Sequence, residues 1–357
     1  MHPMKKLFKL VFLFLLIPFI GFSNDPDFIH TKQKSIKKAY FVNSDASLYV
    51  DNSYGNIAVT TWNENKIELD INIKVSGGNE NWVNQRINDI DIDIVALKLM
   101  ITAKTILGNS SYKSAGKNNS FQINYTLKIP KNGSVKLYNK YGNINTTDLF
   151  AATDIKCKYG KVALGRLSGN LNNLLLEYCP NSSISFIKNA TITARYSYLK
   201  IDEVTKIDLV SDYTDVDIAS GEFVKYNSKY GTIELKNVNT LDATGNYLTI
   251  KIGELFNNLK LTTKYSKVSI GNISAKANAV NITAGYTALN IGYDTNYIFD
   301  FDVIVKFASF KYGNELEFDN KEDSNNLKKF SGFYKKKGIN MVTIISDYGN
   351  VILVKKQ

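Results

Sequence analysis

A short phrase built around a tyrosine recurs through the middle of this chain, and its spacing constrains the fold more than any other feature. The gaps between successive tyrosines are 18, 19, 18, 17, 17, 17, 18 and 21 residues. Repetition at a short, nearly fixed period is typical of solenoids, in which each unit buries its apolar face only by stacking on its neighbours. The nine tyrosines are Tyr141, Tyr159, Tyr178, Tyr196, Tyr213, Tyr230, Tyr247, Tyr265 and Tyr286.

The residues on either side of each tyrosine alternate between apolar and polar. Around Tyr213, for example, Ile207 and Leu209 precede it, and Val216 and Ile218 follow it. Alternation with a period of two indicates strands with one buried face. The alternation slips by one residue directly after the tyrosine, where small or conformationally permissive residues stand, so we expect a bend there between two strands.

Coils of this length are too short to repeat as antiparallel hairpins. Parallel stacking fits better, with each strand ~4.8 Å from its equivalent in the next coil. Parallel crossovers strongly prefer right-handed winding. The predicted fold is therefore all-β: a single-stranded right-handed parallel β-helix, or β-solenoid, with 17–21 residues per coil.

The tyrosines should then form a ladder. By the period-two alternation they lie on the same side of the strand as the apolar residues before them, and a small residue two positions earlier leaves room for a ring. We therefore expect an inward or corner-lining stack, in which each aromatic pair adds roughly 0.5–1.5 kcal/mol. The alternative is an exposed ladder that stacks on sugar rings.

The N-terminus has the features of a secretory signal peptide over residues 1–23, with a basic start followed by an apolar run from Leu10 to Phe22. Removing these residues takes away three lysines and no acid, so the formal charge falls from +11 to +8. Residues 24–39 are expected to be a flexible leader. No other segment could span a bilayer as a helix.

Residues 40–130 are predicted to be a β-rich cap that contains the first repeat, SYGNIAVTTW around Tyr54. The segment NENWVNQRINDI at 79–90 has helical spacing and predicts one short amphipathic helix. A polar loop, GNSSYKSAGKNN, separates two long strands. Such a cap would cover the unpaired backbone groups of the first coil.

The regular solenoid is assigned to residues 131–292, and residues 293–357 to irregular coils and a closing strand. In this last part Tyr312-Gly313 resembles a shifted copy of the phrase. The segment around Tyr348 restores the pattern and is interpreted as the last coil or a closing strand.

The residue types needed for many active sites are scarce. After signal cleavage the only histidine is His30, which argues against His-dependent triads and His-ligated metal or haem sites. Cys157 and Cys179 differ in register, so no disulfide is predicted between them. No metal site and no cofactor is expected. Basic residues form no continuous stripe, so nucleic acid is not an expected partner.

Acidic residues leave one catalytic alternative open. Asp215 and Asp217 alternate outward on one strand, with Glu234 one coil away. Two carboxyl groups about 5–9 Å apart can perform glycoside chemistry. Outward positions on any strand are usually polar, however, and Lys, Asn and Thr occupy the equivalent columns elsewhere.

The stretch IPKNGSVKLYNKYGNINTTDL, continuing into TDIKCKYGKVALGRLSG, resembles the putative adhesin family of bacterial envelope proteins. Pro130, Gly142 and Gly160 carry the match, the closing SDYGNVIL resembles the family's final coil, and the likeness spans about residues 40–357. The chain differs by placing a tyrosine before each bend. The resemblance implies an exported, non-enzymatic, single-stranded right-handed β-helix.

These features together predict an exported scaffold in the periplasm or at the surface of a Gram-negative-type bacterium. It would bind a protein or glycan of the cell envelope through a flat side of the β-helix. Two alternatives remain: a carbohydrate-active enzyme, either a polysaccharide lyase or a hydrolase, and a periplasmic accessory in envelope-stress signalling.

Overall fold

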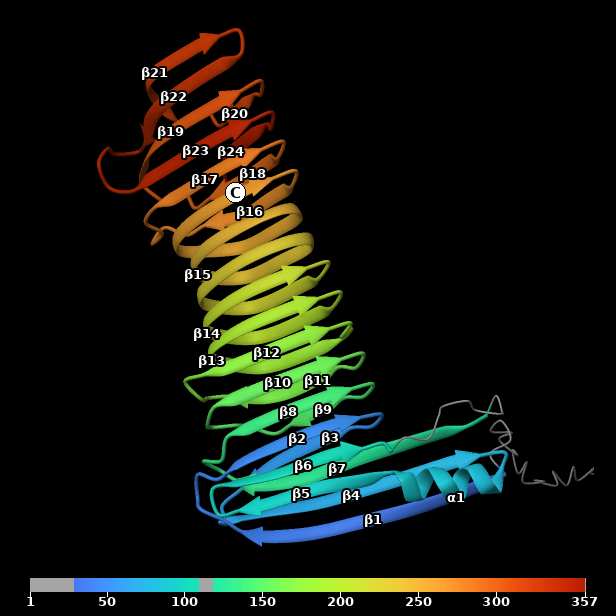
Figure 1. Cartoon of the computed structure of the whole chain (residues 1–357). Coiled ribbons are helices and arrows are strands. Elements are labelled where there is room, and N and C mark those ends of the chain that lie inside the picture. The colour runs from blue at the N-terminus through green and yellow to red at the C-terminus, as the bar shows by residue number, and fades with distance from the viewer. Residues whose placement is uncertain (1–28, 109–117, 357) are drawn as a thin grey trace, which may run out of the picture.

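A computed structural model describes residues 29–108 and 118–356 of the 357-residue chain. The expected signal peptide, the first residues of the expected leader and most of the polar loop lie outside these ranges. The described part is β-rich with one helix, so the prediction of an all-β chain is confirmed. Figure 1 shows strands piled along one long axis, with β1 at one end and the β21–β22 hairpin at the other.

The strands and the helix are numbered along the chain. They are β1 (His30–Phe41), β2 (Ser47–Ser53), β3 (Ile57–Trp62), β4 (Lys66–Gly77), α1 (Glu80–Asp89), β5 (Asp91–Leu97), β6 (Met100–Ile106), β7 (Ser120–Pro130), β8 (Val135–Lys140), β9 (Ile144–Thr146), β10 (Thr153–Lys158), β11 (Val162–Leu167), β12 (Asn172–Glu177), β13 (Ser182–Arg195), β14 (Tyr198–Asp212), β15 (Asp215–Lys264), β16 (Lys267–Ile273), β17 (Val280–Gly285), β18 (Ala288–Tyr293), β19 (Phe299–Lys306), β20 (Phe310–Tyr312), β21 (Glu317–Ser324), β22 (Leu327–Tyr334), β23 (Met341–Asp347) and β24 (Val351–Lys355).

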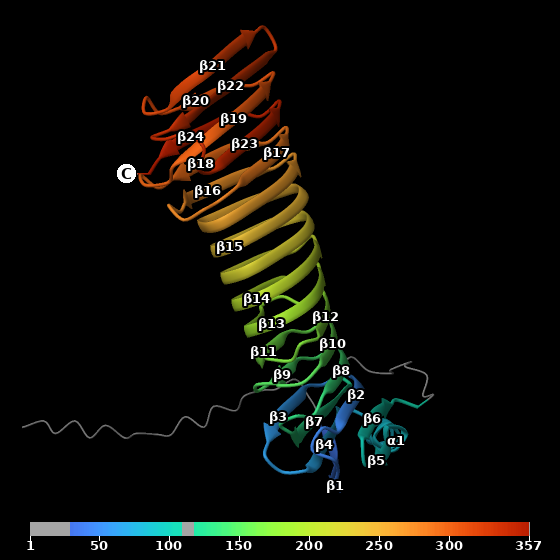
Figure 2. The ribbon, with the colours of Figure 1, turned by 90° about the vertical axis from the view of Figure 1, so that its left-hand side faces the viewer.

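Through the middle of the chain, each strand pairs in parallel with its equivalent one repeat away. Thr153 in β10 lies opposite Val135 in β8 on one side and opposite Asn172 in β12 on the other. The same relation continues from β13 to β14 and from β14 into β15. In each repeat unit one strand precedes the ladder residue and one follows it, so two rows of parallel strands run along the stack (Figures 1 and 2).

The sheet as a whole is mixed, because antiparallel strands close both ends. At the N-terminal end β1 pairs with β4, β4 with β7, and β5 with β6, all antiparallel. At the C-terminal end β22 pairs antiparallel with both β19 and β21. Hairpins at the two ends therefore cover strand edges that the parallel stack alone would leave unpaired.

The N-terminal cap holds the first unit between two later ones. β2 pairs in parallel with β6 on one side and with β8 on the other, and β3 lies in the same way between β7 and β9. The expectation of a flexible leader through residue 39 is wrong for residues 30–39. They belong to β1, which pairs with β4 along all 12 of its residues.

The predicted helix is present as α1. Asn79 caps its N-terminus, because its side-chain oxygen accepts a hydrogen bond from the Trp82 amide at 3.0 Å. Val83 and Ile87 are buried against the cap. No helix in the described ranges is both long enough and apolar enough to cross a membrane.

The C-terminal segment is inserted between earlier units rather than added at the end. β23 pairs in parallel with β17 and with β19, while β24 lies between β18 and β20. The unit around Tyr348 therefore stands between those of Tyr286 and Phe307. The expectation that Tyr312-Gly313 copies the phrase is wrong, because Phe307 stands at the ladder position in this unit.

The core consists of aliphatic columns, as the alternation predicted. Ile207, Leu209, Val216 and Ile218 are all buried, and equivalent residues of neighbouring units lie against them. The apolar residues eight positions after many tyrosines are also buried and fill the far end of each unit: Leu149, Leu167, Val204, Val238, Leu255 and Ile273. Burial of aliphatic surface along the whole axis supplies most of the driving force for folding.

The inserted C-terminal unit should be as important for stability as the central ones. Replacing the fully buried Ile344 by alanine should lower the free energy of unfolding by about 2–5 kcal/mol, because a cavity forms between two stacked units. Chemical denaturation measures this change.

Its neighbour Ile345 provides the control, since its side chain is 39% exposed on the same strand. Ile345→Ala should cost below about 1 kcal/mol. Equal effects of the two substitutions would contradict the placement of β23 inside the stack.

Candidate functional site

The predicted tyrosines lie in one continuous stack along the axis. Neighbouring ring centroids are 4.6–5.2 Å apart, and from Tyr141 to Tyr286 the ring planes differ by 17° or less. Tyr54 precedes this series, and Tyr348 and Phe307 extend it at the other end. We call this series the tyrosine ladder.

Every tyrosine of the ladder has a left-handed backbone conformation. Their φ angles lie between 49° and 61°, and Phe307 has a φ of 49°. The change of side-chain parity therefore arises at the tyrosine itself, and not at the small residue after it as the sequence suggested. Glycine or asparagine normally occupies such positions, because a β-carbon makes this conformation unfavourable by roughly 1–2 kcal/mol.

Strain and stacking nearly cancel in this arrangement. An aromatic pair contributes roughly 0.5–1.5 kcal/mol beyond the burial of its area. The left-handed backbone costs a similar amount for each tyrosine. The stacking term therefore only offsets the strain, so the stability that a tyrosine adds over a glycine comes from the buried part of its ring, and the stack fixes the lateral position of each unit against the next.

The ladder lies on the surface and does not face inward, which corrects the preferred expectation. Its tyrosines are 36–52% exposed, whereas the aliphatic residues beside them are buried. Both faces of each inner ring are covered by the neighbouring rings. The alternative expectation of an exposed ladder is right about the exposure, but the ring faces are not free to stack on sugars, because only ring edges and hydroxyl groups reach solvent.

The ladder hydroxyls bond no other protein group in the described ranges. Tyrosine hydroxyls that do have partners lie outside the ladder, for example Tyr125 with Thr105, Tyr138 with Asp154, and Tyr297 with the Asn278 carbonyl. The ladder therefore presents a row of phenol groups that can donate and accept hydrogen bonds, repeated once per unit.

A shallow groove lies beside the ladder, on the row of strands that follows the tyrosines. Its volume is about 690 Å³. Gly253 and Gly271 contribute bare backbone to it, and a β-carbon on either residue would meet a carbonyl oxygen of the preceding unit. Thr249 and Lys267, two residues after ladder tyrosines, also line it, so the groove adjoins the ladder.

Two of the three candidate carboxylates lie in this groove. Asp217 and Glu234 both line it, and Lys251 Nζ donates to Glu234 Oε2 at 2.9 Å. Asp215 does not line it. Its Oδ1 instead accepts a hydrogen bond from the Thr232 amide at 2.7 Å, which ties one unit to the next.

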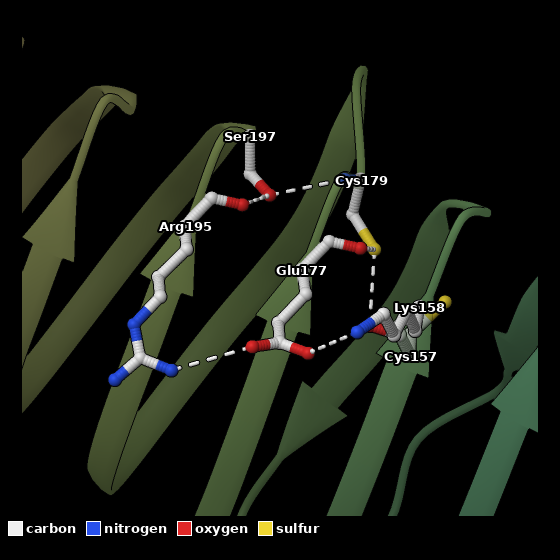
Figure 3. A network of polar contacts seen from close by, with 6 residues as sticks. All are labelled: Cys157, Lys158, Glu177, Cys179, Arg195 and Ser197. Atoms are coloured by element: carbon white, nitrogen blue, oxygen red, sulfur yellow. Dashed lines mark hydrogen bonds and ion pairs between the residues drawn. The ribbon is translucent and has the colours of Figure 1, made fainter.

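A three-residue ion network crosses adjacent units on the other row of strands (Figure 3). Glu177 pairs with Lys158 at 3.2 Å and with Arg195 at 3.3 Å. The hydrogen bond from Lys158 is the main cause that lowers the pKa of Glu177, and Arg195 lowers it further. These residues directly precede ladder tyrosines, so the network supports the same register.

The structure brings the two cysteines together, although they differ in register as expected. Cys157 pairs with Leu176 across the sheet, yet the Cys179 thiol donates to the Cys157 carbonyl oxygen at 3.2 Å (Figure 3). Both thiols are free and buried. The neighbouring Cys179 thiol and burial both raise the pKa of the Cys157 thiol, which itself donates to the Gly142 carbonyl oxygen at 3.6 Å. No group of three or more potential metal-binding His, Cys, Asp or Glu side chains occurs within the described residues.

The sequence did not predict the contact between the cysteines, because one cysteine lies before the bend of its unit and the other lies after the bend of the next unit. Residues two before and one after a ladder tyrosine meet beneath it, as Thr263 and Ser266 do at 2.9 Å. Their sizes compensate, since Leu248 fills the space that Gly245 leaves. This compensation acts within one unit and places Cys157 against Gly160, so it does not locate the contact between the two cysteines, which belong to successive units.

Comparison with known proteins gives a likeness to solved structures only. No protein-family model matches the chain, and no curated protein matches it. A putative cell adhesion protein from Clostridium sporogenes aligns at 12% identity and a TM-score of 0.18, over 91% of this chain and 100% of that one. A putative adhesin from Parabacteroides distasonis aligns at 9% identity and a TM-score of 0.32, over 90% and 97% of the two chains. A putative adhesin from Bacteroides fragilis has 9% identity, a TM-score of 0.27 and the same coverage.

Because the ladder tyrosines have a left-handed backbone, we expect an unusual order of stability for glycine and alanine variants at a ladder position. Tyr213→Gly and Tyr213→Ala both lose the ring contacts, but only the glycine variant relieves the strain. The glycine variant should therefore be more stable than the alanine variant by about 1 kcal/mol or more in chemical denaturation.

Val210, on the strand before Tyr213 and without a positive φ, provides the matched control. There glycine should be less stable than alanine, by about 0.5–1 kcal/mol. If the glycine and alanine variants had the same order of stability at Tyr213 and at Val210, the left-handed geometry of the ladder would be contradicted.

The ion network predicts a small stability effect that depends on pH. Because the pKa of Glu177 is lowered in the folded state, its ionised form stabilises the fold above the pKa of the unfolded chain. Glu177→Gln should lower the free energy of unfolding at pH 7 by less than about 1 kcal/mol, since the pair is partly exposed.

The difference between wild type and Glu177→Gln should disappear as the pH falls through the lowered pKa of the folded state. Urea denaturation at several pH values measures it, with Glu203→Gln as an exposed control. A difference that persists unchanged in acid would contradict the pairing of Glu177 with Lys158.

Proposed function

We propose that this protein is an exported, non-enzymatic β-solenoid scaffold of the putative adhesin type. In this proposal it lies in the periplasm or at the cell surface and binds a protein or glycan of the cell envelope. The observation that carries the proposal is the long, regular side formed by the strands after the ladder, with an open groove across several units.

The parallel pairing supports interpreting the middle of the chain as a single-stranded right-handed β-helix. Each unit contributes the same two strands, and hydrogen-bonded partners lie 17 to 21 residues apart. Such solenoids provide extended surfaces on which one kind of contact is repeated many times. A repeated surface suits a repeated ligand or a large one.

The residues of the groove fit recognition of a polar partner. Lys200, Asp217, Glu234 and Lys251 bring two positive and two negative side chains into the groove, and the backbone at Gly253 allows a ligand to approach closely. Mixed charge with exposed backbone favours hydrogen bonding over burial of an apolar ligand.

A carbohydrate-active enzyme is the second candidate, and one observation favours it. Asp217 and Glu234 line the same groove and lie 17 residues apart on successive turns of β15. Two carboxyl groups placed in this way could act as acid and nucleophile in glycoside hydrolysis.

A binding assay with a groove-filling variant tests the scaffold role. The protein without residues 1–23 should bind an isolated envelope fraction saturably. Ser269→Trp, in the groove, should weaken binding at least about tenfold, because the indole blocks the surface. Thr262→Trp, exposed on the strand before Tyr265, should leave binding unchanged. Absence of saturable binding, or equal binding by both variants, would contradict the proposal.

Incubation with envelope polysaccharides separates the two candidate functions. A scaffold releases no new reducing ends or unsaturated products. Product formation that is lost in the double variant Asp217→Asn, Glu234→Gln but kept in Asp215→Asn would favour the enzyme and overturn the scaffold role.

A further inference from the structure

The ladder keeps tyrosine in unit after unit although glycine would relieve the strain. Eleven tyrosines have the left-handed conformation, and each is at least 36% exposed. A phenylalanine would stack and bury its ring equally well, as Phe307 does at its own rung, so stability alone does not explain why tyrosine stands at the other rungs. What tyrosine adds at this position is a phenol hydroxyl on a rigid support.

The spacing of these hydroxyl groups defines what can bind along them. Ring centroids of successive units lie 4.6–5.2 Å apart. An extended peptide rises ~3.3 Å per residue, and a polyproline helix ~3.1 Å, so neither places one residue on each ring. The rise of one sugar unit along an extended β-1,4-linked polysaccharide is close to the ring spacing.

We propose that the tyrosine ladder binds an extended β-1,4-linked polysaccharide strand, lying parallel to the axis with one sugar on each unit. Successive sugars in such a strand face opposite ways and present different hydroxyl edges. A phenol hydroxyl both donates and accepts, so each rung can bond whichever edge it meets. This inference rests on the proposed binding role and names the class of ligand.

The shape of the ladder favours a narrow polymer over a protein partner. The ladder is one residue wide, and ring faces are covered by their neighbours. A stable protein interface buries about 800 Å² per partner, which a single row of ring edges does not provide. A polysaccharide one sugar wide can instead add many weak contacts along its length.

Charge does not favour a polyanion such as nucleic acid. Residues directly before the ladder tyrosines alternate in sign, as in Lys158, Glu177, Arg195, Asp212 and Lys229. Several of these charges pair with one another across units. A neutral, hydroxyl-rich polymer therefore fits the row better than a phosphate backbone does.

The test uses variants that remove hydroxyl groups and keep the rings. The protein without residues 1–23 would carry Tyr→Phe at four central rungs, namely Tyr196, Tyr213, Tyr230 and Tyr247. Phe307 already occupies a rung, with a ring centroid 4.8 Å from that of Tyr348, so phenylalanine fits the column. Tyr226→Phe is the matched control, because this residue is buried away from the ladder.

Isothermal titration with cello- and chito-oligosaccharides should show affinity that rises with length from the disaccharide to the hexasaccharide. Malto-oligosaccharides, whose α-1,4 linkages coil, should bind at least tenfold more weakly. The four-site phenylalanine variant should lose at least tenfold in affinity for the hexasaccharides, while Tyr226→Phe should lose none.

Any of these results would overturn the inference: no binding of either β-1,4-linked series, affinity independent of length, or full binding by the four-site variant. If the protein binds an envelope fraction but none of the oligosaccharides, the scaffold role is still supported and only the proposed class of ligand is refuted. A dimer of the protein that dissociates in the four-site variant would instead identify a second copy as the partner, and would also refute it.

Discussion

The structure depends on the contact between tyrosine rings of successive units. Each ring sits on a left-handed residue that would be unfavourable alone, and the neighbouring rings offset that cost. The two terms are similar in size, so beyond the burial of the rings the stack acts mainly on geometry. It holds each unit in register with the next, because slipping a strand by one residue would separate the rings and turn the aliphatic columns outward.

The alignment of the tyrosine rings at the bend shapes both the interior beneath the ladder and the surface above it. Beneath the ladder, residues on either side of each tyrosine meet in a compact interior where Cys157 and Cys179 touch. Above it, ring edges and hydroxyl groups form an ordered row beside the groove. The same bend that closes the core thus creates the most regular surface of the molecule.

Strand edges at the two ends of the stack are covered in similar ways. A parallel stack leaves open strand edges, which invite association with other chains. At each end one unit is held between others out of sequence order, and antiparallel strands then cover the edge. Of the outermost strands, β1 is rich in exposed lysine, a common means of preventing edge-to-edge pairing.

The central pattern was predictable because it is local. Alternation of apolar residues around each tyrosine gives the strands, their buried faces and the period of the stack, and the spacing in 79–90 gives the helix. The out-of-order placement of β23 was not predictable, since it depends on long-range pairing and no local signal distinguishes it. Phe307 was missed because the repeat is defined by tyrosine, and a phenylalanine at the same position falls outside that pattern.

The direction of the tyrosine side chains was mispredicted for a specific physical reason. Parity arguments assume that the backbone stays extended, and a left-handed residue breaks that assumption at the tyrosine itself. The groove was missed because its floor consists of glycine backbone, such as Gly253 and Gly271, from strands that become neighbours only in the fold. Of the candidate carboxylates, the sequence placed all three outward but could not separate Asp215 from the two in the groove.

A double-mutant cycle between Tyr213 and Tyr230 tests the central claim most directly. Their ring centroids lie 4.6 Å apart. Chemical denaturation of the two alanine variants and the double variant should give a favourable coupling of about 0.5–1.5 kcal/mol, because the backbone strain cancels in the cycle. Tyr213 and Tyr265, separated by two rungs, should show none. A coupling of zero between Tyr213 and Tyr230 would contradict the account.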